Sequence, residues 1–197
     1  MKRALTLFGA LLTLSACSGG IDNNRLRVDV VEDSPREIAV GRMPLSPTSA
    51  YLRNATAQGL VAFDAEGRVV PALASRWIVT DDDLGYIFRL QKIRWNNGRE
   101  VRSDEVAAAL KTRVAELRGS RFGDELAKID KILPMTGKVV EIRLKAPVPN
   151  LLELLAQPEF GMIHKANGSG PMVAERISGS LQLRNRIDEI DGSIAFD

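Results

Sequence analysis

The stretch that decides the fold is Trp77–Leu90, which reads WIVTDDDLGYIFRL. Apolar, β-branched and aromatic residues at both of its ends flank the polar run Asp81–Gly85, and this order predicts a β-hairpin. Successive side chains of a strand point to opposite faces of the sheet. We therefore expect Tyr86, Phe88 and Leu90 to lie together on the buried face of the second strand.

A helix and a further strand are expected C-terminal to this hairpin. Asn97-Gly98 offers the positive φ angles of a tight turn, and Ser103 is the expected N-cap of a helix that ends near Gly119. Apolar residues recur between them at the spacing of one helical face: Val106, Ala107, Leu110, Val114 and Leu117. We also expect a second helix over residues 124–132 and, from strict alternation, a strand over residues 140–144.

The other segments give a mixed pattern of short helices and strands. A short helix is expected over residues 151–155 and a strand over residues 181–183. Toward the N-terminus, alternation predicts a strand over residues 26–30, and prolines and glycine predict a loop over residues 34–47. A helix is expected over residues 50–61, running into a short strand over residues 60–63. The fold class is therefore α/β, in the mixed α+β sense.

The N-terminus has the organisation of a secretory signal. Lys2 and Arg3 precede the apolar run Ala4–Leu14, and small residues follow up to Cys17, the only cysteine of the chain. The apolar run is much shorter than the ~20 residues that a membrane-spanning helix needs. We therefore expect residues 1–16 to be a signal peptide.

The order Leu-Ser-Ala-Cys at the end of this signal has the pattern of a bacterial lipoprotein. That pattern implies cleavage before Cys17, a lipid on its sulfur and acylation of the new amino terminus. The alternative is an ordinary secreted protein with a stray cysteine near the cleavage site. In the first case residues 17–25 are a lipidated, flexible tether and residues 26–197 form the domain. The protein is then anchored to the membrane in the periplasm or on the extracytoplasmic face, and to the outer membrane if the host has one.

The charge of the chain argues against some partners. Cleavage would leave 181 residues (197 − 16), enough for one ordinary domain or two small lobes. Removing Lys2 and Arg3 leaves 25 basic side chains (27 − 2) against 25 acidic ones. A balanced surface has no electrostatic footprint for nucleic acid, so we expect no nucleic-acid partner. With Cys17 acylated, no thiol is left for a disulfide.

The sequence contains little that indicates catalysis, a metal site or a cofactor, and none of the three is expected. His164 is the only histidine, so it lacks the neighbours of a usual metal cluster; we interpret it as a satisfied or surface side chain. Asp81–Asp83 lacks the further spacing of a calcium loop and is interpreted as a solvated turn. Trp77 and Trp95 could stack on a ligand, but packing in the core or at its rim is the preferred interpretation.

An ordered series of motifs over residues 58–114 resembles a known family of binding proteins. The motifs are Gly59-Leu60-Val61, Phe63-Asp64-Ala65-Glu66-Gly67, Val70-Pro71-Ala72-Leu73-Ala74, Trp77, the hairpin to Leu90, Trp95-Asn96-Asn97-Gly98 and Asp104-Glu105-Val106. Looser matches follow at Val139–Pro149, Gly168-Ser169-Gly170-Pro171 and Leu183-Arg184-Asn185. Together they resemble the N-terminal portion of the family 5 extracellular solute-binding proteins, the peptide- and nickel-type substrate-binding proteins of ABC importers.

The resemblance also has departures. Asn96-Asn97 stands where the family has His-Asp, and Met172 stands where it has tyrosine. Family members are more than twice as long and bind ligand between two lobes. The resemblance thus implies the N-terminal part of a bilobal, periplasmic-binding-protein type II-like fold with the distal lobe missing. The acidic residue that holds a peptide amine in the family has no match here, so the ligand-binding residues stay unknown.

The resemblance implies a binding protein and not an enzyme. The predicted function is capture of a small solute, expected to be a peptide, and its delivery to ABC permease subunits by an apparently shortened, monomeric lipoprotein. The alternative is a structural or interaction lipoprotein without a transport role, or a remnant that no longer binds ligand. Fold resemblance by itself does not identify the solute.

Overall fold

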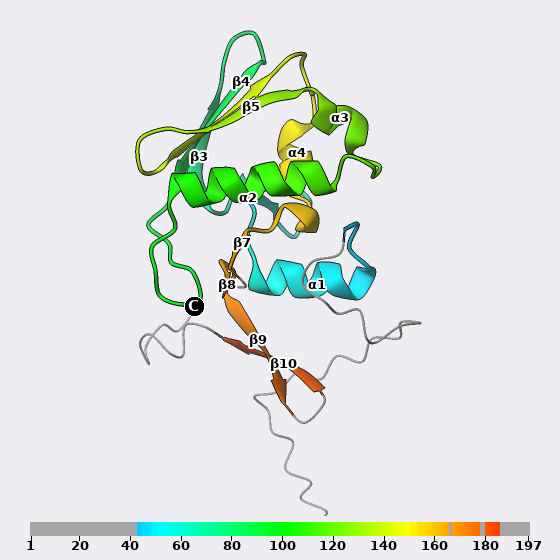
Figure 1. Ribbon diagram of the computed structural model, residues 1–197, viewed down its shortest axis with the longest axis vertical. Helices are drawn as coiled ribbons and strands as arrows, with labels where there is room; N and C mark the ends of the chain where they lie inside the picture. The colour runs from blue at the N-terminus through cyan, green and yellow to red at the C-terminus, as the bar shows by residue number, and fades with distance from the viewer. Residues whose placement is uncertain (1–42, 166, 178–179, 186–197) are drawn as a thin grey trace, which may run out of the picture. The chain divides into compact units, whose positions relative to one another are not determined.

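The computed structural model describes residues 43–165, 167–177 and 180–185 (Figure 1). The expected signal peptide, Cys17, the tether, the strand over residues 26–30 and most of the loop over residues 34–47 lie outside the described residues. None of the described helices is both long and apolar enough to cross a membrane.

The described elements are short helices separated by groups of antiparallel strands. The helices are α1 (Pro47–Thr56), α2 (Ser103–Glu116), α3 (Gly123–Ala127), α4 (Leu151–Leu155) and the 3-10 turn η2 (Pro158–Phe160). The strands are β1 (Val61–Phe63), β2 (Val69–Pro71), β3 (Ala74–Val79), β4 (Gly85–Leu90), β5 (Ile129–Pro134), β6 (Val139–Leu144), β7 (Ile163–His164), β8 (Asn167–Gly168), β9 (Met172–Ile177) and β10 (Ser180–Asn185).

The centre of the fold is a four-stranded antiparallel sheet in the order β3-β4-β6-β5. The predicted hairpin is confirmed as β3 and β4, in which Trp77 lies opposite Phe88. Its turn is closed by the Thr80 amide, which donates to the Gly85 carbonyl at 2.9 Å. Asp83 in the same turn has a φ of +56°, in the left-handed region that few residues other than glycine, asparagine and aspartate adopt readily.

The buried face of β4 is the one that alternation predicted. Tyr86, Phe88 and Leu90 are 6%, 0% and 3% exposed. Figure 1 shows α2 lying along the sheet, and its apolar stripe is buried in the same core as these three side chains. That stripe is Val106, Ala107, Leu110 and Val114, with Leu117 directly after the helix. The hairpin, β6 and α2 therefore form one apolar core.

Three expectations from the sequence are wrong in detail. The helix expected over residues 124–132 ends at Ala127, and Ile129–Pro134 is strand β5. Pairing decides this segment, because Ile132 is buried and lies opposite Ile142 of β6. Local helical spacing could not anticipate that neighbour.

The two other errors concern the bounds of the helices α2 and α1. Ser103 is the first residue of α2 and not its N-cap; Arg102 holds that position, and its backbone amide donates to the Glu105 carboxylate at 3.4 Å. The helix expected over residues 50–61 is α1, which begins at Pro47 and already ends at Thr56. The short strand expected over residues 60–63 is confirmed as β1. Ser46 caps α1 by accepting from the Ser49 amide at 3.3 Å. Proline suits this first position because its fixed φ is already helical.

Phe88→Ala should destabilise the protein by about 3–5 kcal/mol, because it removes a fully buried aromatic ring and leaves a cavity. The measurement is the midpoint of urea unfolding followed by far-UV circular dichroism. Ile78→Ala is the matched control, since Ile78 lies in the same hairpin but is 60% exposed. Equal shifts for the two variants would contradict the assignment of the buried face.

Candidate functional site

Gly168-Ser169-Gly170, here called the glycine clasp, joins three separate segments of the chain. The Gly170 amide donates to the Thr56 carbonyl at the end of α1, at 2.8 Å. The Asn96 amide, in the turn before α2, donates to the Gly168 carbonyl at 3.0 Å. The end of α1, the Trp95–Gly98 turn and the start of β9 therefore meet at this clasp.

Ser169, the serine of the clasp, is a buried polar residue. Its side chain is fully buried, and its hydroxyl oxygen accepts from the Gln58 amide at 3.0 Å. The same hydroxyl lies 3.1 Å from the Met162 carbonyl oxygen and 3.3 Å from the Gln58 carbonyl oxygen, so its proton has an acceptor in either direction. A buried hydroxyl costs little when it is hydrogen-bonded in this way.

The two glycines are required by close approach of backbones. A Cβ atom at Gly168 would overlap the Thr56 carbonyl, and one at Gly170 would overlap the backbone of Thr56 and Ala57. Neither neighbour is the movable end of a side chain, so the overlap could be relieved only by shifting main chain. The Gly-x-Gly pattern that resembles the family motif is thus explained here by packing.

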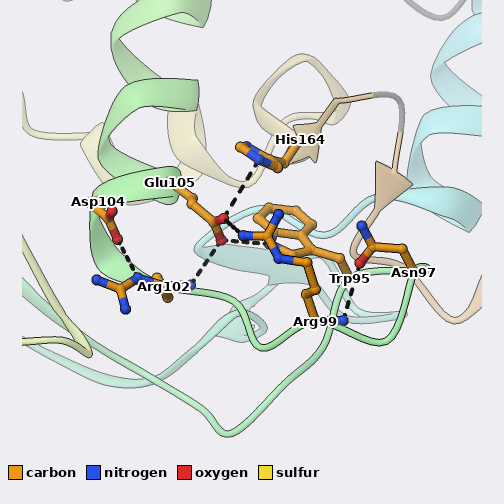
Figure 2. A network of polar contacts seen from close by, with 7 residues as sticks. All are labelled: Trp95, Asn97, Arg99, Arg102, Asp104, Glu105 and His164. Atoms are coloured by element: carbon orange, nitrogen blue, oxygen red, sulfur yellow. Dashed lines mark hydrogen bonds and ion pairs between the residues drawn. The ribbon is translucent and has the colours of Figure 1, made fainter.

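A second cluster is centred on the Glu105 carboxylate (Figure 2). Its Oε2 atom accepts from the indole Nε1 of Trp95 at 2.8 Å, and its Oε1 atom accepts from the Arg99 guanidinium at 2.5 Å. His164 Nε2 lies 3.6 Å from Oε1, and the His164 ring stacks on Trp95 with 5.6 Å between centroids. The cluster ties the start of α2 to the Trp95–Gly98 turn and to β7.

The Glu105 cluster confirms two interpretations from the sequence. His164 is partly buried beside the Trp95 ring and the Glu105 carboxylate, as expected of a structural side chain, and Trp95 is a core residue that is 1% exposed. Trp77 is partly buried and packs against the same core. Because the Glu105 oxygens accept from Trp95 and Arg99, this carboxylate anchors the turn to the start of α2.

The aspartates of the hairpin turn also serve the turn itself. Asp82 accepts from the Thr80 hydroxyl at 2.5 Å and from the Leu84 amide at 3.0 Å. These hydrogen bonds, the one from Thr80 first, lower the pKa of the Asp82 carboxyl. Among the described residues no group of three histidine, cysteine, aspartate or glutamate side chains could hold a metal ion. Asp81, Asp82 and Asp83 are exposed in the turn between β3 and β4, so their interpretation as a solvated turn is confirmed.

Buried charge is concentrated where α1, α2 and η2 meet, here called the helix junction. Arg53 of α1 is 3% exposed and Glu159 of η2 is 5% exposed. Burial, and then the nearby charge of Arg113, lower the Arg53 pKa to about 10, so this guanidinium stays protonated at neutral pH. Burial also lowers the pKa of Arg113, which pairs with Glu116 at 2.7 Å.

The helix junction was not anticipated from the sequence. Arg53 and Glu159 are charged residues that lie far apart in the sequence, and their elements come together only through the tertiary fold. The sequence gives one indirect indication. The helix α1 carries few large apolar residues, so polar side chains are expected on the face that packs against the rest of the fold. Cys17, the one site residue that the sequence did name, lies outside the described residues.

The chain is similar to one protein family and to several individual proteins. Residues 68–180 match the family model of the bacterial extracellular solute-binding proteins, family 5 Middle. The probable deoxycholate-binding periplasmic protein YgiS of Escherichia coli K12 is 29% identical over 119 residues, which cover 51% of this chain and 22% of that protein. The glutathione-binding protein GsiB of Escherichia coli O1:K1 is 32% identical over 114 residues, covering 55% and 22%. A putative ABC transporter peptide-binding protein of Brucella ovis is 28% identical over 116 residues, covering 58% and 22%.

Solved structures show the same fold. AgaA of Agrobacterium tumefaciens R10, solved with agropinic acid, superposes with a TM-score of 0.65 at 24% identity, covering 74% of this chain and 33% of that one. OppA of Listeria monocytogenes bound to peptide superposes with a TM-score of 0.60 at 18% identity, covering 72% and 35%. The matched part of the chain thus spans about a fifth of the length of the curated relatives and about a third of the solved structures.

These superpositions agree with a mixed α/β fold of the periplasmic-binding-protein type II-like kind, matched over part of its length. The family model covers the central sheet, α2, the helix junction apart from α1, and the glycine clasp. The chain belongs to the bacterial extracellular solute-binding proteins of family 5.

Proposed function

We propose that this protein is an extracytoplasmic, lipid-anchored substrate-binding protein of an ABC importer that acts on peptides. The observation that carries the proposal is the family match over residues 68–180, which includes the sheet and the clasp. Family 5 proteins are the periplasmic or extracytoplasmic binding components of ABC importers. Relatives named for peptides and for glutathione, itself a small peptide, favour that class of solute.

The proposed mechanism is binding without bond-making chemistry. The solute is captured outside the cytoplasm and passed to permease subunits, and the lipid on Cys17 keeps the protein near them. Several acyl chains hold a protein at a membrane far better than one, since each buried methylene contributes about 0.8 kcal/mol. A balanced net charge, +2 for the whole chain, leaves the anchoring to the lipid.

The affinity of this chain for a peptide depends on how much of the site it supplies. A ligand cleft buries most of the surface of its ligand, and the resemblance implies that the family closes two lobes on the solute. The described residues correspond to about a third of the solved relatives. We therefore expect contacts on one side of a peptide only, and each 1.4 kcal/mol of lost contact weakens binding about tenfold.

Short peptides should bind the full chain saturably but weakly, with a dissociation constant on the order of 1 mM. The measurement is chemical-shift perturbation of the ¹⁵N-labelled protein by a mixed tripeptide library, with glucose as the matched control solute. No saturable shift at concentrations well above millimolar would contradict the proposal and favour the structural or interaction lipoprotein. Micromolar binding would keep the function and show that the chain carries a complete site.

Cys17→Ala should abolish lipid labelling and block cleavage at residue 16, because the thiol is the proposed attachment point. Metabolic labelling with a radioactive fatty acid, followed by immunoprecipitation, measures both outcomes. Ser18→Ala is the control and should keep its label. Equal labelling of wild type and Cys17→Ala would contradict lipidation and support the alternative of an ordinary secreted protein.

A further inference from the structure

Helix α1 is docked on the rest of the described fold with little apolar contact. Its buried side chains are Thr48 and Arg53, both polar. No residue of α1 belongs to the buried apolar core that joins the sheet to α2 and α4. Its aromatic residue, Tyr51, is 75% exposed. Most helices of globular proteins are held by an apolar stripe, so α1 needs another source of attachment.

Arg53 is the buried charged residue of α1 and is 3% exposed. Its aliphatic stem lies over Gly161, where a Cβ atom would come within 3.0 Å of the Arg53 Cγ and Cδ atoms. The glycine therefore makes room for the stem, and the guanidinium is brought to the helix junction. There both terminal nitrogens, Nη1 and Nη2, are buried without a hydrogen-bond partner among the described residues.

Glu159 is the natural counter-charge for this guanidinium. Glu159 stands two residues before Gly161, over which the Arg53 stem lies, and its Oε2 atom is also buried without a hydrogen-bond partner among the described residues. Two carboxylates attract the Arg53 guanidinium, Glu116 more strongly and Glu159 next. The other nearby carboxylate, Glu116, is already paired with Arg113 at 2.7 Å and is more exposed. Arg121, whose side chain is 72% exposed, approaches Glu159 only at its second oxygen, Oε1, at 3.8 Å.

A buried charge is costly unless an opposite charge and hydrogen bonds compensate it. The buried atoms without a partner are the donors Nη1 and Nη2 of Arg53 and the acceptor Oε2 of Glu159. An interaction between the two side chains would lower the cost of burying both charges. Groups that do not touch directly can be joined through a bridging water at nearly the enthalpy of a direct hydrogen bond. We propose that Arg53 and Glu159 form a buried charge pair, closed through water, that docks α1 onto η2.

The pair has a consequence for the glycine clasp. The last turn of α1 supplies the Thr56 carbonyl that accepts from Gly170, three residues after Arg53 along the helix. Fixing Arg53 therefore fixes the acceptor on which the start of β9 is placed. Arg53 and Glu159 are positioning residues in this account: they act on the β9–β10 ribbon through α1 and the clasp.

A double-mutant cycle in the full chain tests the pair, with Arg53→Met, Glu159→Met and the double variant. Amide hydrogen exchange is followed by mass spectrometry in peptides from α1 and, as an internal reference, from β4. Each single variant should speed exchange in α1 by about tenfold or more, because the remaining charge stays buried and loses the partner that the pair supplies. The double variant should exchange more slowly in α1 than either single variant, because it leaves no lone charge.

Arg121→Met is the matched control, since it removes an exposed arginine from the same junction and should leave α1 exchange unchanged. Additive effects of the two single substitutions would overturn the proposal, as would unchanged exchange in α1 for either of them. If a single variant does not fold, the double variant decides: recovery of a folded chain supports the pair, and failure of both contradicts it.

Discussion

The placement of α1 beside the ribbon of β9 and β10 depends on the close approach of two backbones, that of Gly170 and that of the end of α1. One hydrogen bond from the Gly170 amide to the Thr56 carbonyl and the absence of a Cβ atom allow this approach. Ser169 fills the space beside it and binds the main chain of Gln58 and Met162. Without this contact the ribbon of β9 and β10 would have no fixed place beside α1, because a two-stranded ribbon is only marginally stable alone.

Two kinds of interaction therefore hold the elements of this fold together. The sheet and α2 share an apolar core in which Phe88, Val140 and Ile142 are fully buried, and burial of this kind stabilises without demanding particular angles. The parts around α1 are joined by hydrogen bonds and charges instead. Directional contacts fix orientation more strictly than apolar packing. Such an arrangement suits a binding protein, in which the relative placement of segments shapes the surface offered to a solute.

The sequence predicted what depends on local pattern and missed what depends on distant partners. The hairpin and its buried face followed from alternation around Phe88, and the tight turn at Gly98, with a φ of +81°, followed from Asn97-Gly98. Strand β5 was mistaken for helix because its pairing partner, β6, comes later in the chain. The burial of Arg53 could not be anticipated either, since Glu159 lies far away in sequence. Of the clasp, the motif was visible and its acceptor at Thr56 was not.

The clasp joins α1 to the ribbon of β9 and β10. Amide hydrogen exchange in the Gly170→Ala variant tests this joint most directly. A Cβ atom at Gly170 meets main chain, whereas one at Gly119 meets nothing within 4 Å, so Gly119→Ala is the matched control. We predict that Gly170→Ala loses protection in α1 and β9, keeps it in β4, and is destabilised by about 1–3 kcal/mol. Unchanged protection in α1 and β9, with Gly119→Ala and Gly170→Ala indistinguishable, would contradict the account.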